Sequence, residues 1–150
     1  MLSTFKEAMI AFERGQFPLA QELFTSAIDA SDNTALSYAK RGVCRLRQGH
    51  PDAAAADFQQ ALAQDERCLP ALVNLGNLAL EAGQLDAAQV HYETALRIDA
   101  SYGFAHYNLG VLLRKRGDIA ASVRELRLAA KYESKAEATK KRLRFWKRRT

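Results

Sequence analysis

The sequence has no apolar run of about 20 residues, the length that a membrane-spanning helix requires. Its first residues carry charges at Lys6, Glu7 and Glu13, which interrupt any apolar segment of the kind that a secretory signal needs. We therefore expect no transmembrane segment, and we expect a protein that acts inside the cell, in the cytoplasm.

Cysteine, histidine and proline are all scarce. The two cysteines, Cys44 and Cys68, are too far apart in the sequence for a redox motif, and no further ligands accompany them. The three histidines form no cluster along the chain. We therefore expect reduced thiols, no metal site and no cofactor. With only three prolines and abundant alanine, the composition favours helix.

Positive charge is concentrated at one end of the chain. Residues 134–150 contain eight Lys or Arg and one Glu, a net charge of +7, whereas the whole chain has +5. The first 133 residues therefore carry −2, so the basic character belongs to the C-terminal segment.

The glycines repeat with a period of 34 residues. Gly15, Gly49, Gly83 and Gly117 form one series with this spacing, and Gly42, Gly76 and Gly110 form a second. Other positions keep the same period and the same type of side chain, among them Phe24, Phe58, Tyr92 and Leu126, and Ala27, Ala61, Ala95 and Ala129. The period predicts four units without insertion, at 1–34, 35–68, 69–102 and 103–136.

Each unit predicts two amphipathic helices joined by a tight turn. In the third unit, apolar residues recur three or four positions apart on both sides of Gly83. Glycine supplies the turn conformation that other residues resist, and Gly76, Ala88 and Ala95 allow the two helices to approach closely. One hairpin cannot bury its own faces, so such units stack into a solenoid. The predicted fold is all-α, a superhelix of antiparallel helix hairpins in a single domain.

The 34-residue period, together with the small and aromatic positions, resembles the tetratricopeptide repeat (TPR). The similarity covers residues 1–136, and NLG at 74–76 and 108–110 is close to the family's first-helix motif. The sequence departs from the family pattern in the first two units, where Glu7 and Arg41 replace the usual leucine. We expect Arg41 and Arg45 to extend along apolar surface or to pair with Glu22 or Asp29.

No catalytic motif is present. The sequence contains no GxSxG, HExxH or Walker-type loop, and the repeat accounts for the glycines. We expect a protein that is not an enzyme.

The resemblance implies a concave groove lined by the first helix of each hairpin, where relatives bind peptides. Ala39 and Phe104 belong to this face. The groove positions carried over to this sequence are Phe5, Met9, Phe12, Lys40, Val43, Arg47, Val73, Asn74, Asn77, Tyr107, Asn108, Val111 and Arg114.

Two parts of this set stand out. Phe5, Met9 and Phe12 share one helix face and are either an exposed apolar patch or part of the core. Asn74 and Asn108 lie one period apart, and their amides suit the main chain of an extended peptide, although this asparagine is also simply common in the repeat. The lysine and asparagine that some relatives use to grip a peptide carboxylate are absent.

The resemblance thus implies a protein-protein interaction scaffold that binds a peptide or a partner helix. Self-assembly into an oligomer is an alternative. The basic segment 137–150 resembles the start of a fifth unit, with Leu143 and Trp146 three positions apart, and is expected to form a helix that caps the last hairpin. Its charge offers a second alternative, electrostatic binding of RNA or an acidic protein, although no nucleic-acid-binding motif is present.

Overall fold

The computed structural model describes the backbone of residues 1–147 and the side chains of residues 1–138 and 140. Its described part consists of helices and the short turns and loops between them, without strands. The eight helices are α1 (Thr4–Glu13), α2 (Phe17–Asp29), α3 (Thr34–Arg47), α4 (Pro51–Gln64), α5 (Leu69–Glu81), α6 (Leu85–Ile98), α7 (Gly103–Lys115) and α8 (Ile119–Lys147).

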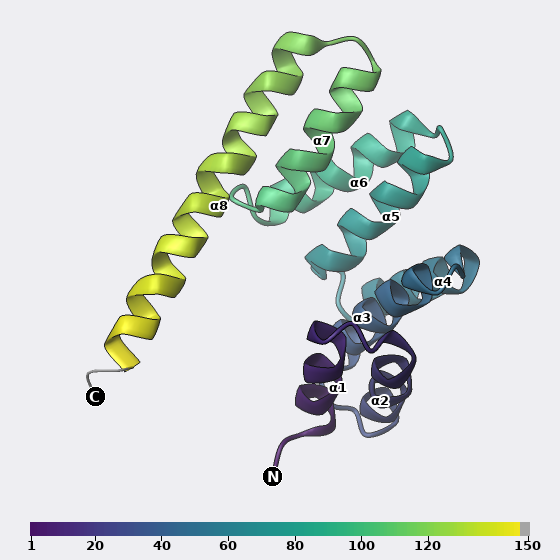
Figure 1. Cartoon of the computed structure of the whole chain (residues 1–150). Helices are drawn as coiled ribbons and strands as arrows, with labels where there is room; N and C mark the ends of the chain where they lie inside the picture. The colour runs from purple at the N-terminus through teal and green to yellow at the C-terminus, as the bar shows by residue number, and fades with distance from the viewer. Residues whose placement is uncertain (148–150) are drawn as a thin grey trace.

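The helices pack as consecutive antiparallel hairpins, α1 with α2, α3 with α4, α5 with α6 and α7 with α8 (Figure 1). The turn inside each hairpin contains a glycine with a positive φ, between +72° and +85°, where an L side chain would be strained. These are Gly15, Gly49, Gly83 and Gly117, the first glycine series of the sequence. The period therefore marks the turns correctly, and the predicted all-α solenoid is confirmed.

The second glycine series makes room for large side chains inside the hairpins. A Cβ atom added to Gly42 would lie 2.6 Å from the Phe58 ring, and one added to Gly76 would lie 2.5 Å from the Tyr92 ring. Phe58 and Tyr92 are fully buried. The absence of a side chain on the first helix thus allows a ring of the second helix to pack directly on its backbone.

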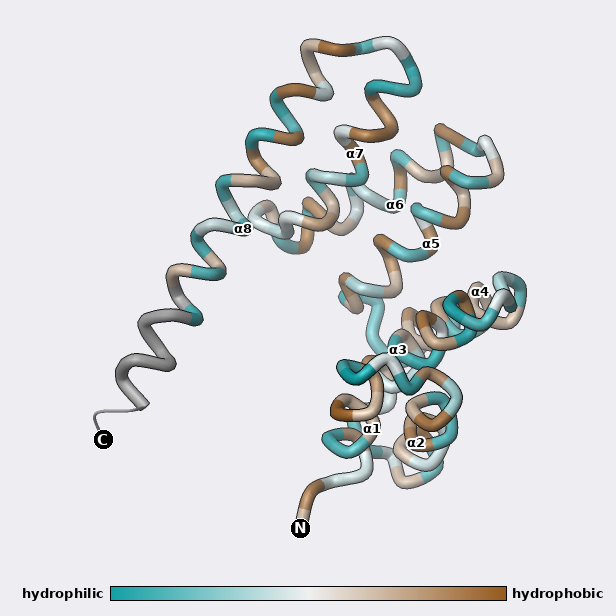
Figure 2. The backbone as a smooth tube through the Cα atoms, viewed as in Figure 1, coloured by the Kyte–Doolittle hydropathy of each residue, from teal (hydrophilic) through white to brown (hydrophobic). Residues whose placement is uncertain are grey.

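The core consists of three clusters that follow one another along the solenoid. One cluster lies in the first hairpin and reaches Cys44, a second joins α3, α4 and α5, and a third joins α5, α6 and α7. Leu62 packs against both the second and the third cluster. Figure 2 shows the corresponding alternation of hydrophobic and hydrophilic residues along each helix.

The first two hairpins meet through α2 and α3, and buried charged groups lie beside this contact. Asp57 on α4 is buried and accepts two hydrogen bonds from the Arg41 guanidinium, at 2.8 and 3.0 Å, while Arg45 lies 2.9 Å from the same carboxylate. Arg41 also donates to the Thr25 hydroxyl on α2. The expected partners Glu22 and Asp29 are therefore wrong: the two arginines pair within their own hairpin, and Arg41 reaches back to the preceding one.

The last helix is much longer than the others. α8 runs without a break from Ile119 to Lys147, so the predicted boundary at residue 136 does not coincide with an end of the helix. Residues 137–147 continue the second helix of the last hairpin and project from the solenoid (Figure 1). The side chains of Leu143 and Trp146, on which the capping prediction depended, lie outside those described. Among the described helices, none has the length and apolarity to cross a membrane.

Candidate functional site

A cavity of about 240 Å³ lies where α3, α5 and α7, the first helices of three successive hairpins, come together. α5 contacts both α3 and α7, which places the three helices in a row. Six predicted groove residues line this cavity: Lys40, Val43, Val73, Asn74, Asn77 and Asn108. The sequence thus predicted the shared face of three helices that are 34 residues apart.

Four further residues line the cavity, Ala39, Pro70, Tyr102 and Phe104. Ala39 and Phe104 lie on the predicted groove face. Pro70 was missed although it occupies the same repeat position as Phe104, so the period could have indicated it. Tyr102 was missed because it precedes the start of α7, where the repeat pattern assigns no groove contact.

Asn74 and Asn108 present equivalent amides to the groove. The Asn74 Nδ2 donates to the Pro70 carbonyl at 2.7 Å, and the Asn108 Nδ2 donates to the Phe104 carbonyl at 2.8 Å. Each bond fixes the amide against its own helix, one turn back. Among the described residues nothing engages the Oδ1 atom or the second Nδ2 hydrogen, so each amide retains an acceptor and a donor for a ligand.

Asn77 has a structural role as well. Its Oδ1 accepts a hydrogen bond of 2.7 Å from the Tyr92 hydroxyl. Tyr92 is fully buried, and this burial raises the pKa of its phenol to about 12. Asn77 therefore fixes the ring that packs on Gly76, and the position is less free to serve a ligand than Asn74 or Asn108.

Two cations on α3 lie over aromatic rings of the first hairpin. The Lys40 Nζ is 4.9 Å from the centre of the Phe12 ring, and the Arg47 guanidinium is 5.7 Å from the centre of the Phe17 ring. These distances are within the range of a cation–π interaction. Neither cation has a carboxylate partner among the described residues, and both therefore keep their charge available to a ligand.

The predicted apolar patch belongs partly to the core. Phe5, Met9 and Phe12 are half-buried and pack against the cluster of the first hairpin. The Phe5 and Phe12 rings lie 6.0 and 6.3 Å from the ring of the buried Phe24. None of the three lines either of the described cavities. Both earlier alternatives thus hold in part, because these side chains are core residues with one accessible edge.

The aromatic residues of α7 are considerably more exposed. Phe104 retains 69% of its surface and Tyr107 retains 56%, and the Phe104 ring lies 5.6 Å from that of Tyr102. Of the remaining predicted positions on α7, Val111 is half-buried and Arg114 is exposed. Together Phe104 and Tyr107 form an accessible aromatic edge at the α7 side of the cavity.

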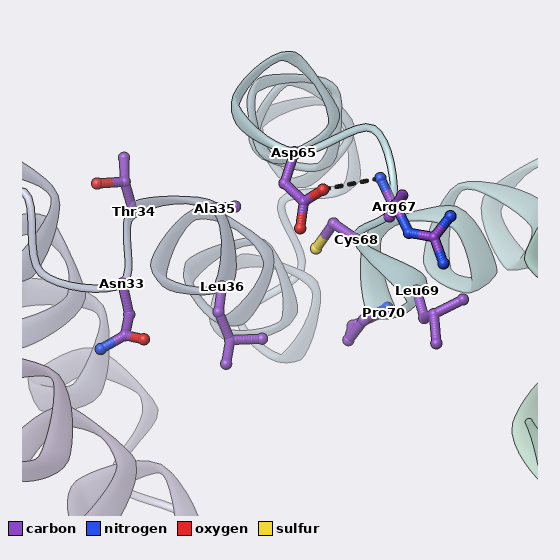
Figure 3. A pocket seen from close by; sticks show the side chains of 9 residues that line it. All are labelled: Asn33, Thr34, Ala35, Leu36, Asp65, Arg67, Cys68, Leu69 and Pro70. Carbon is purple, nitrogen blue, oxygen red and sulfur yellow. Dashed lines mark hydrogen bonds between the residues drawn. The ribbon is translucent and has the colours of Figure 1, made fainter. Parts of the chain in front are cut away.

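A larger cavity of about 430 Å³ lies beside the starts of α3 and α5, and it shares Pro70 with the first. Figure 3 shows its lining, in which the Asp65 carboxylate accepts a hydrogen bond of 3.0 Å from the Arg67 main-chain amide. It is open and is lined by the first residues of α3 and α5 and by the loops before them, so we place the candidate site in the first cavity, where side chains from three helices converge.

The two cysteines and His106 are buried outside the groove. Burial raises the pKa of the Cys44 thiol to about 11 and also raises that of Cys68. His106 is buried, with its ring nitrogens 2.6 Å from the Glu125 carboxylate and 2.8 Å from the Ala100 carbonyl. No group of three potential metal ligands occurs among the described residues.

Several solved structures share this fold. A thermophilic TPR protein of Thermus thermophilus superposes with a TM-score of 0.77 at 18% identity, over 87% of this chain and 73% of its own. MamA gives 0.70 at 22% identity, over 90% and 79%. The first TPR of Spaghetti (RPAP3), bound to the HSP90 peptide SRMEEVD, gives 0.68 at 18% identity, over 76% and 90%. These identities establish the fold alone.

Comparison with protein families is more direct. No curated protein sequence is similar enough to be matched to this chain. A model of the tetratricopeptide repeat matches residues 5–67 and 73–138, and a second TPR model matches residues 45–100. TPR folds typically act as non-catalytic scaffolds for protein-protein interaction. The matches span most of the sequence, and the chain belongs to the tetratricopeptide repeat family.

Proposed function

We propose that this protein is an interaction scaffold that binds a segment of a partner protein across α3, α5 and α7. The observation that carries the proposal is the pair of amides at Asn74 and Asn108, which face one cavity and each retain an unused donor and acceptor. An extended segment presents main-chain N–H and C=O groups that match such amides irrespective of its sequence.

The surroundings of the two amides support the same proposal. The cavity wall is mainly apolar and includes Val43, Val73 and Phe104, as is usual for a site that buries part of a ligand. A structural neighbour, the Spaghetti TPR, holds a peptide. We place the action of the protein in the cytoplasm, where buried thiols such as Cys44 and Cys68 remain reduced.

Site-specific photocrosslinking tests the groove against the rest of the surface. A benzophenone side chain is introduced at Tyr107, beside the cavity, or at Val90 on α6, outside it; the two positions are 56% and 59% exposed. In lysate of the native organism, we expect discrete crosslinked partners from position 107 and not from position 90. Equal crosslinking from both positions would contradict the proposal.

A second experiment removes the side-chain amides of the groove and compares the result with removal of an amide outside it. Asn74→Ala with Asn108→Ala removes the two groove amides, whereas Gln60→Ala removes an exposed amide from α4. We expect the double variant to lose the crosslinks from position 107 and the control to retain them, with equal helicity by circular dichroism. If the crosslinked partner is a second copy of this chain, the groove serves self-assembly.

The C-terminal part of α8 favours a second function, binding of a polyanion such as RNA or an acidic protein. Residues 133–138 and 140 are exposed, and the segment 134–150 carries a net charge of +7. Such binding is electrostatic and weakens steeply with salt. Loss of RNA binding on deletion of residues 137–150 supports this function, and binding that survives the deletion argues against it.

A further inference from the structure

The groove is chemically different at its two ends. One position, six residues into each unit, is occupied by Lys6, Lys40, Asn74 and Asn108 in chain order. Lysine thus fills this position in the first two units and asparagine in the last two. A ligand that crosses the first helices in turn meets ammonium groups at one end and neutral amides at the other.

At the basic end, the two cations of α3 lie over aromatic rings and do not pair with carboxylates in the described part of the chain. Lys40 is the only charged residue among those that line the cavity, and its Nζ lies over the Phe12 ring. Arg47, two turns further along α3, lies over Phe17. In the described part of the chain no carboxylate neutralises either cation, although both are well placed to attract one. The ring contacts orient the two charges without cancelling them.

At the opposite end, the α7 residues that line the cavity are uncharged, and the predicted groove residue Arg114 lies further along α7, outside this lining. Phe104 lines the cavity beside Asn108, and Tyr107 lies on the next turn of α7. Both rings are more than half exposed, whereas the core rings Phe24, Phe58 and Tyr92 are fully buried. Exposed aromatic surface beside a cavity is typical of the place where a partner buries a large apolar side chain.

From this asymmetry we infer that the groove binds an extended acidic segment of a partner protein, with its carboxylates at Lys40 and a large apolar side chain at Phe104 and Tyr107. The inference rests on the proposed function and specifies its ligand. Between the two ends, Asn74 and Asn108 hold the main chain. Charge complementarity selects the acidic residues, and the exposed rings select the apolar one.

The geometry sets the spacing between the two features of the ligand. A segment that reaches from Lys40 on α3 to Phe104 on α7 crosses α5, and therefore two helix spacings of about 8–10 Å each. An extended chain rises about 3.3 Å per residue. The acidic and apolar residues are therefore separated by about five residues along the segment.

Synthetic peptides test both the charge and the spacing. The probe is Asp-Asp-Ser-Ala-Ser-Ala-Phe with blocked ends; the comparison peptides replace both Asp by Lys, replace Phe by Ser, or shorten the spacer to a single Ser. Binding is measured by NMR titration, which detects weak complexes. We expect the probe to shift the side-chain amide signals of Asn74 and Asn108 and to bind at least about fivefold more tightly than each comparison peptide.

Charge reversal in the protein completes the test. Lys40→Glu should weaken binding of the acidic probe by about tenfold and improve binding of the Lys peptide. Lys131→Glu, the same change on α8 and outside the groove, should alter neither. The inference is overturned if the peptides with Asp and Lys bind equally, or if Lys40→Glu has no effect.

The acidic preference of the groove and its role as a peptide site give different results in these experiments. If the Lys peptide binds as well as the probe and still shifts the Asn74 and Asn108 signals, the groove is a peptide site and only its acidic preference is wrong. If none of the peptides shifts these signals and crosslinking from position 107 also yields no partner, the proposed function itself is wrong.

Discussion

At the scale of single residues, the strictest requirement is for glycine, which has no side chain, at positions in the first helix of a hairpin. Gly42 and Gly76 each accept a buried ring of the following helix, and the Tyr92 ring is held further by its hydrogen bond to Asn77. Gly110 differs, because its neighbour is Leu126, an aliphatic side chain that is only half-buried. The packing around this repeat position therefore excludes a side chain more strictly in some units than in others.

Replacing Gly76 with alanine should lower the free energy of unfolding by about 1–2 kcal/mol. The added methyl group overpacks the contact with Tyr92, at a cost of about 1–3 kcal/mol, while the better helix propensity of alanine returns about 0.5–1 kcal/mol. Urea denaturation measures the change. Gly110→Ala is the matched comparison and should cost less, because the half-buried Leu126 is freer to shift than the buried Tyr92 ring, although the added methyl group also approaches the Ser122 carbonyl oxygen to 3.3 Å. Equal losses in the two variants would contradict this explanation.

The sequence predicts these glycine positions well, because their period is visible without any coordinates. It did not predict the partner of Arg41 and Arg45. Asp57 occupies the position held by Leu23, His91 and Glu125 in the other units, so the residue type at this position varies and does not indicate a buried partner for the two arginines. Arg41 itself has no counterpart, because Glu7, Leu75 and Leu109 hold its position in the other units. A pair that occurs in one unit alone leaves no periodic trace in the sequence.

At the scale of elements, α8 combines two parts with different surroundings. Its first part packs on α7, with Ser122 and Ala129 buried and Tyr132 stacked on His106 at 5.5 Å between ring centres. Beyond Tyr132, residues 133–138 and 140 are exposed. The period predicted both segments as helical, but it could not predict that one helix continues into the other, because apolar spacing is the same in a continued helix and in a new one.

A chain that ends after Lys135 should be about as stable as the full chain. The deleted residues with described side chains make no buried contact, so we expect a change in the free energy of unfolding below about 0.5 kcal/mol. A chain that ends after Leu128 also loses Ala129 and Tyr132 and should be less stable by about 2 kcal/mol. Thermal unfolding followed by circular dichroism distinguishes the two. A large loss in the first truncation would instead support the predicted cap at 137–150.

At the scale of the whole molecule, the hairpins are joined unequally. The second and third core clusters share Leu62, whereas the cluster of the first hairpin shares no member with the second. The first hairpin is joined to the second through an extensive contact of α2 with α3, which includes Cys44 and the hydrogen bonds of Arg41 to Thr25 and of Gln48 to Gln21. In a solenoid, stability is approximately the sum of such neighbour contacts.

Replacing Asp57 with asparagine should therefore loosen one end of the array. The side chains of Arg41 and Arg45, 14% and 25% exposed, lose their counter-charge, which we expect to cost about 2–3 kcal/mol because some solvent reaches them. Hydrogen exchange should accelerate in α1 to α4 much more than in α5 to α8. A uniform acceleration in all of these helices would mean that the array unfolds as one unit.

The candidate site was predicted less completely than the fold, and its role in binding stays a prediction. The shared face of α3, α5 and α7 followed from the period, and six of its residues line the cavity. The positions at α1 were less certain from the sequence, because a helical stripe such as Phe5, Met9 and Phe12 is equally consistent with a core. Which stripe is buried depends on the neighbouring helix, and that information lies outside the stripe itself.

The absence of insertions between units has a consequence for how a ligand finds its place. An array of identical units offers a long partner several equivalent docking frames, each displaced by one hairpin, and a partner that slips between them is held without a defined orientation. Here the frames are not equivalent, since lysine changes to asparagine at the same position between Lys40 and Asn74. This single change of residue type at an otherwise periodic position distinguishes one docking frame from the others.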